Sequence, residues 1–186
     1  MELAFPRIAK ENAWFKEVAI VLGASILIAL SAPFALHLPF TPVPIVLQSH
    51  VILLMGALLG SKRGALAVLA FLAQAAAGLP VLASGKCGIL VFAGPTGGYL
   101  LGYVIGAYLV GLLLEKFRSR SSAKTFGALA AGSIAIYFFG ALHLAGFVGY
   151  EKALLLGVVP FLLGDLVKTI VCARLLKAPS SLDQLA

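Results

Sequence analysis

The chain has 186 residues, of which 61% are hydrophobic and 11% charged, and its mean hydropathy is +1.07. Soluble domains are about half apolar and about a quarter charged, so this composition excludes an ordinary water-soluble protein. The net charge of +7 could indicate nucleic-acid binding, but the basic residues lie mainly in short segments between long apolar stretches. That placement is typical of the cytoplasmic loops of membrane proteins, so the lipid bilayer is an expected partner and nucleic acid is not.

Six apolar segments are long enough, or nearly so, to cross a bilayer as helices, which takes about 20 residues each. In chain order they are Val18–Leu36, Ile45–Gly60, Gly64–Val81, Gly97–Leu114, Phe126–Val148 and Leu154–Leu176. The second segment is short, and the last contains Pro160, Asp165 and Lys168. Because short connections separate the segments, we predict one all-α domain over residues 1–186, an up-and-down bundle of six transmembrane helices.

The distribution of Lys and Arg predicts how this bundle is oriented. With six spans, eleven of the 14 basic residues lie on the side of the N-terminus, Lys86 and Lys152 lie on the opposite side, and Lys168 lies within a span. Cytoplasmic loops are enriched in Lys and Arg. We therefore predict that both termini are cytoplasmic and that the protein is a multi-pass protein of the cytoplasmic (inner) membrane.

Two connections on the predicted outer side are rich in proline or glycine, and they cover residues 33–44 and 78–98. Irregular backbone near membrane depth is tolerated where it is buried in protein or lines a cavity. We therefore predict a solute pocket near the outer face, capped by these loops. In the second loop, Ser84 and Lys86 could reach a solute, or they could lie in a solvated turn.

Asp165 and Lys168 are ionisable residues inside the last apolar segment, and their spacing of three places them on one helix face. Pro160 suits the first turn of a helix, which puts the pair one to two turns inside the outer boundary. Ionisable groups at this depth usually face a cavity or each other. Either the pair only holds the bundle together, or Lys168 binds an anionic group of a solute while Asp165 accepts hydrogen bonds.

A glycine-rich turn precedes the fourth segment in Gly94-Pro95-Thr96-Gly97-Gly98-Tyr99. Backbone N–H groups at Gly98 could approach a solute closely, and Tyr99 could supply a ring and a hydroxyl. The alternative is that Gly98, Gly102 and Gly106 form a seam for close helix packing. Gln48, at the outer start of the second segment, could contact a solute or make an ordinary interhelical hydrogen bond.

The first segment carries a small-residue step at Ala19 and Gly23, which lets another helix approach closely. This step could pack within the bundle or dock a separate membrane protein. No motif for hydrolysis, nucleotide binding or metal ligation is present, and His37, His50 and His143 have no partners at metal-ligand spacing. We therefore expect neither an enzyme nor a cofactor or metal.

Five motifs of the chain together resemble those of one transporter family. They are Pro42-Val43-Pro44-Ile45-Val46-Leu47-Gln48, Leu58-Leu59-Gly60-Ser61-Lys62-Arg63-Gly64, Gly78-Leu79-Pro80-Val81, Gly94-Pro95-Thr96-Gly97-Gly98-Tyr99-Leu100 and Pro160-Phe161-Leu162-Leu163-Gly164-Asp165-Leu166-Val167-Lys168. In this order they resemble the biotin-specific substrate-binding (S) components, the BioY family, of energy-coupling factor (ECF) transporters. The loop Ser84-Gly85-Lys86-Cys87-Gly88 departs from the more glycine-rich stretch of that family.

The resemblance implies a six-helix S-component bundle that binds biotin near the outer face. Its implied contacts are the biotin carboxylate with Lys168 and the ureido N–H groups with Asp165. The substrate-binding set also includes Tyr99, Gly98, Gln48 and Ser84. An ATPase pair and a transmembrane coupling protein would supply the energy, with Ala19 and Gly23 as the docking surface. Two other hypotheses stay open: an accessory membrane protein without a substrate, and a secondary transporter driven by protonation of Asp165.

Overall fold

The computed structural model describes residues 5–36, 39–117 and 121–176, and in this part of the chain helices dominate. The elements are α1 (Phe5–Leu30), β1 (Ala35–Leu36), β2 (Ile45–Val46), α2 (Gln48–Ala76), η1 (Ala83–Gly85), α3 (Leu90–Ala93), α4 (Gly97–Lys116), α5 (Ser122–Val148), α6 (Tyr150–Gly157) and α7 (Val159–Leu175). Within the described residues, four helical stretches, 48–76, 97–116, 122–148 and 150–175, are long and apolar enough to cross a membrane. The prediction of a multi-pass helical membrane protein is confirmed at this level.

Helix α2 covers the second and third predicted segments, and it bends sharply between them at Gly60. Gly60 has φ 83° and ψ 177°, outside the helical region, and glycine reaches this conformation without a steric penalty. A Cβ atom on Gly64 would lie 2.7 Å from the Cα atom of Gly56, so the two arms, 48–59 and 61–76, pack closely beside the bend.

The bend is held from outside by Glu115, near the end of α4. The Ser61 N–H donates to Glu115 Oε1 at 2.6 Å, and the Ser61 hydroxyl donates to Oε2 at 2.9 Å. The carboxylate therefore satisfies one of the amide groups that the start of the second arm leaves without a partner in its own helix.

The last predicted segment is divided into α6 and α7, because Val158, with φ −127° and ψ −57°, interrupts the helix. Pro160 lies in the first turn of α7, as predicted, where the missing N–H costs no helical hydrogen bond. The first predicted segment also differs, since α1 ends at Leu30 and a turn follows before Pro33. Proline cannot continue the helix there because it lacks the N–H donor.

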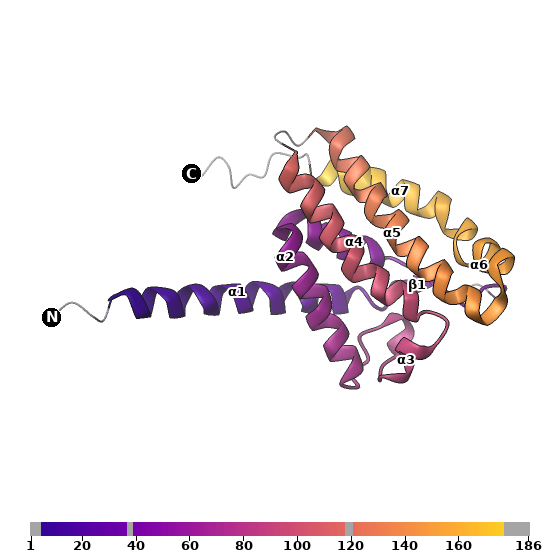
Figure 1. Cartoon of the computed structure of the whole chain (residues 1–186), viewed down its shortest axis with the longest axis horizontal. Helices are drawn as coiled ribbons and strands as arrows, with labels where there is room; N and C mark the ends of the chain where they lie inside the picture. Colours follow the sequence, from indigo (N-terminus) through magenta and orange to yellow (C-terminus); the bar gives the residue numbers. More distant parts are fainter. Residues whose placement is uncertain (1–4, 37–38, 118–120, 177–186) are drawn as a thin grey trace.

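Helix α4 packs between α2 and α5, and α7 packs on α5 (Figure 1). Glycines permit this close approach: Cβ atoms on Gly56 and Gly102 would overlap the backbone of Ala107 and Ile136, respectively. Helix α1 packs against α2, while its N-terminal half extends away from the other helices in Figure 1. The connection after α2, residues 77–96, forms short helical turns at η1 and α3 and leads back to the start of α4.

Candidate solute-binding site

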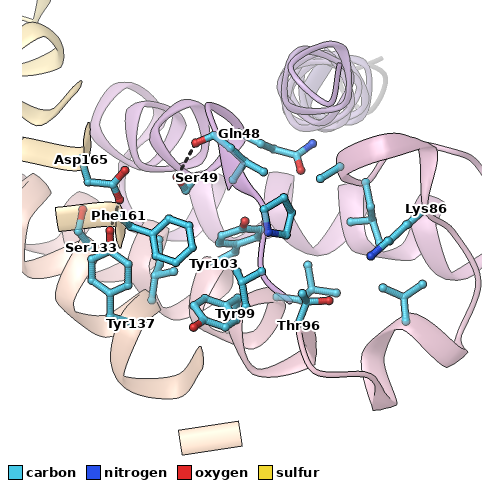
Figure 2. A pocket seen from close by; sticks show the side chains of 18 residues that line it. Gln48, Ser49, Lys86, Thr96, Tyr99, Tyr103, Ser133, Tyr137, Phe161 and Asp165 are labelled. Atoms are coloured by element: carbon cyan, nitrogen blue, oxygen red, sulfur yellow. Dashed lines mark hydrogen bonds between the residues drawn. The ribbon is translucent and has the colours of Figure 1, made fainter. Parts of the chain in front are cut away.

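A cavity lies where the start of α2, the loop around η1, and helices α4, α5 and α7 meet, and Figure 2 shows the side chains that line it. It encloses about 770 Å³ of space between atoms when its open mouth is included. Its walls are mostly aliphatic and aromatic, and the rings come from Tyr99, Tyr103, Tyr137 and Phe161. Among the described residues that line it, the charged ones are Asp165 and Lys86, and Figure 2 shows them at opposite ends.

At the first end, Asp165 is held by hydrogen bonds from two helices. Tyr137 of α5 donates its hydroxyl to Asp165 Oδ2, and Lys168, one turn further along α7, donates to Oδ1 at 2.7 Å. The Asp165 side chain is 13% exposed. A carboxylate has about four acceptor positions, so these bonds leave Asp165 able to accept further N–H groups.

His50 of α2 extends this network behind Asp165. Its ring is buried, its Nδ1 atom lies 3.9 Å from Asp165 Oδ1, and its Nε2 atom lies within hydrogen-bond distance, 3.1 Å, of Thr169 Oγ1. The polar groups of α2, α5 and α7 therefore meet at one point in an otherwise apolar bundle. Such a network orders the side chains that take part in it.

Lys168 is close to Asp165 but does not line the main cavity. Besides its bond to Asp165, its ammonium donates to the carbonyl oxygen of Val46 in β2 at 3.0 Å. It lines a separate, shallow pocket beside β1 and β2, which also includes Phe34 and Ile45. The structure thus brings the predicted pair together, but it directs only the carboxylate toward the cavity.

Gln48 and Tyr99 both line the cavity, and both are held in place by hydrogen bonds to distant backbone. The Gln48 amide nitrogen donates to the carbonyl oxygens of Ile28 at 3.1 Å and Val81 at 3.0 Å, which ties α1 and the loop to α2. The Tyr99 hydroxyl donates to the Gly157 carbonyl at 2.8 Å. Gly140 of α5 leaves room for the Tyr99 ring, since a Cβ atom there would overlap it.

The other predicted contacts lie outside the cavity wall. A Cβ atom on Gly98 would overlap Phe139 and His143 of α5, so Gly98 lies at a close contact between α4 and α5. Ser84 is exposed in η1, although its neighbours Ala83 and Lys86 line the cavity. The small-residue step on α1 is exposed, and nothing lies within 4 Å of a Cβ atom built on Gly23.

Several lining residues were not identified from the sequence, and the two polar ones on α5 are Ser133 and Tyr137. Ser133 and Tyr137 are four residues apart, which places them on one face of the helix, near Asp165 in Figure 2. A tyrosine in the middle of an apolar span is a usable signal, because its hydroxyl needs a partner. Ser133 is 9% exposed, and among the described residues its hydroxyl has no hydrogen-bond partner.

In the described part of the chain, no three His, Cys, Asp or Glu side chains gather in a group that could hold a metal ion. Fold and site together define a class: a helical membrane protein with a cavity for a small, mostly apolar solute that carries hydrogen-bond donors. The chain belongs to the BioY family, whose sequence profile matches residues 7–182.

Individual relatives agree with this family assignment over most of the chain. The biotin transporter BioY of Rhizobium etli is 37% identical over 170 residues, which cover 87% of this chain and 90% of the relative. The biotin transporter BioY of Thermotoga maritima is 42% identical over 139 residues, covering 74% and 81%, respectively. A crystal structure of the S-component for biotin from an ECF-type ABC transporter matches with a TM-score of 0.81 and 31% identity, covering 89% of this chain and 90% of that one.

Proposed function

We propose that this protein captures biotin as the substrate-binding component of an ECF transporter. The observation that carries the proposal is the cavity itself, which combines an acceptor carboxylate at one end with aromatic walls and an ammonium at the other. Biotin has the matching parts in the same order: ureido N–H donors, an apolar bicyclic ring and a carboxylate on a flexible tail. The relatives are transporters rather than enzymes, and this chain is a transporter subunit of the same family.

In the proposed pose, the ureido group lies at the Asp165 end. The Asp165 carboxylate accepts one of the ureido N–H groups, and the Ser133 hydroxyl donates to the ureido oxygen. This pairing gives Ser133 the partner that it lacks among the described residues. An unpaired buried hydroxyl costs about 1–3 kcal/mol, so a solute that satisfies it is favoured by a similar amount. Tyr99, Tyr103 and Phe161 form the walls around the bicyclic ring.

The other predicted site residues have supporting roles in this proposal. Lys168 orients Asp165 and compensates its charge, since its ammonium is already bonded to that carboxylate and to Val46. Gln48 holds the loop over the cavity through Val81. Gly98 allows α4 to approach α5, which positions Tyr99, and Ser84 shapes the turn that presents Lys86.

For the membrane arrangement, we propose six crossings made by α1, the two arms of α2, α4, α5 and the α6–α7 pair. Both termini are cytoplasmic, and the cavity opens to the outer side of the cytoplasmic membrane. The support is the excess of Lys and Arg on the side of the N-terminus, together with Lys86 at the cavity and Lys152 on α6 on the opposite side.

Energy for uptake would come from an ATPase pair and a transmembrane coupling protein, because the chain carries no nucleotide-binding motif. Ala19 and Gly23 on α1 form the proposed docking surface, since they are exposed and small. Gly23→Arg should abolish biotin uptake in cells that supply the coupling proteins, yet leave biotin binding by the purified protein unchanged. Gly127→Arg is the matched control, because nothing lies within 4 Å of a Cβ atom built on Gly127 either. Loss of uptake in both variants would count against a specific docking surface.

The direct test of biotin capture is equilibrium binding of radiolabelled biotin by the purified protein in detergent. We expect saturable binding at one site per chain, displaced by unlabelled biotin. Absence of binding would refute the proposal. Uptake that follows a proton gradient without ATP would instead indicate secondary transport.

A further inference from the structure

Lys86 is the one basic residue among the described residues that line the cavity, and it lies at the end opposite Asp165 (Figure 2). No hydrogen bond or ion pair holds its ammonium within the described part of the chain. Lys168, the other basic residue near the site, has its ammonium bonded to Asp165 and Val46 and lines a different pocket. Among the described residues that line the cavity, Lys86 is therefore the one whose ammonium is available to bind a negative group of a solute.

The backbone around Lys86 is ordered by its own hydrogen bonds. Leu82 N–H donates to the Lys86 carbonyl at 3.2 Å, and Gly85 N–H donates to the Leu82 carbonyl at 3.0 Å. Ser84 and Gly85 have positive φ angles of 63° and 71°, and the chain makes a tight turn at these two residues. Because Leu82 is buried and lines the cavity, this turn anchors Lys86 to the cavity wall.

The start of α4 adds positive potential at the same end. Thr96, the N-cap residue of this 20-residue helix, lines the cavity and lies in the same half of Figure 2 as Lys86. The first N–H groups of a helix carry a net partial positive charge that favours anions within about one turn. The helix start and the Lys86 ammonium therefore favour the same kind of ligand group, a carboxylate.

We propose that Lys86 binds the carboxylate of the solute and makes the site selective for the free acid over neutral derivatives. This inference rests on the proposed function, and it assigns the carboxylate to Lys86 instead of Lys168. The placement of Asp165 and Lys86 at opposite ends of the cavity supports the assignment. When the ureido group pairs with Asp165, the tail of the molecule extends toward the Lys86 end.

The test compares binding of biotin with binding of biotin amide, in which a neutral carboxamide replaces the carboxylate. We expect the wild-type protein to bind biotin about ten-fold more tightly than the amide, the size of one charge-assisted hydrogen bond at a partly solvated position. Lys86→Gln should lose this preference by weakening biotin alone, with amide affinity unchanged. Lys86→Arg should keep the preference. Increasing salt should weaken wild-type binding of biotin more than that of the amide.

Lys152→Gln is the matched control, since it removes one positive charge from an exposed position on α6. It should bind both compounds as the wild type does. Unchanged amide affinity in Lys86→Gln shows that this variant is folded. The inference is overturned, while biotin capture stands, if the wild type binds both compounds equally or if Lys86→Gln keeps the preference. If the wild type binds neither compound, the proposed function fails and this inference fails with it.

Discussion

The two ends of the cavity use opposite kinds of charged site. At the Asp165 end, the carboxylate is largely buried and is bonded to Tyr137 and Lys168. At the Lys86 end, the ammonium is exposed and, in the described residues, unpaired. A buried, pre-oriented charge contributes much to selective binding, and its loss is costly, whereas an exposed charge contributes less because water competes for it. Recognition of the solute should therefore depend mainly on the Asp165 end.

The same comparison separates two lysines that look alike in the sequence. Lys168 lies within a span, where an ammonium requires partners, and it finds them in Asp165 and the Val46 carbonyl. Lys86 lies in an exposed loop, where its ammonium has no hydrogen-bond partner among the described residues and stays available to a ligand. We therefore expect Lys168 to stabilise the site and Lys86 to bind the solute. The following substitutions test this difference.

The largest effect is expected for Asp165→Asn. An amide oxygen accepts fewer hydrogen bonds than a carboxylate, and the substitution also leaves the Lys168 ammonium without its charged partner. We expect biotin affinity to fall by about 100-fold or more, since one charge-assisted hydrogen bond is worth about 1.5–3 kcal/mol and the unpaired Lys168 ammonium adds a further cost. Titration of the purified variant with labelled biotin measures this.

Glu151→Gln is the control for Asp165→Asn, because it makes the same chemical change at an exposed position in α6. It should leave biotin affinity unchanged. Near-normal binding by Asp165→Asn would show that the ureido group does not depend on this carboxylate.

A smaller effect is expected for Lys168→Met, which keeps much of the side-chain volume but removes the ammonium. Asp165 loses one of its two hydrogen-bond donors, so its orientation is less well held and its charge less well compensated. We expect affinity for biotin and for biotin amide to fall by the same factor, about 30-fold, or about 2 kcal/mol. Competition binding with both compounds measures this ratio. A selective loss of biotin binding would assign the carboxylate to Lys168 after all.

The smallest effect is expected for Ser133→Ala. Removing one neutral hydroxyl that donates to the ureido oxygen should weaken biotin binding by about ten-fold. Thermal stability without biotin should not decrease, because this hydroxyl makes no hydrogen bond with the described residues. Melting curves with and without biotin measure both quantities. Ser122→Ala, at the start of α5, is the control. Unchanged biotin affinity in Ser133→Ala would place the ureido group elsewhere.

Much of the fold could be predicted because its causes are local. The apolar segments predict spans, and Pro160 marks the start of a helix in both the sequence and the structure. The sequence predicts a short connection between the segments Ile45–Gly60 and Gly64–Val81. In the structure the chain bends at Gly60, and the second arm of α2 begins directly after the bend. The break at Val158 had no local signal, and a valine there gives no warning of a non-helical residue.

The sequence by itself determined that the protein is a helical membrane protein and that Asp165 and Lys168 lie on one helix face, because hydropathy and helical spacing depend on neighbours along the chain. Only the tertiary structure decided which of the two faces the cavity. The carbonyl of Val46, 122 residues from Lys168, holds the ammonium away from it, while Tyr137 holds Asp165 from a different helix. Such contacts depend on how the helices pack, so the spacing of residues within one segment does not predict them. The same packing brings Lys86 from a distant loop to the opposite end of the cavity.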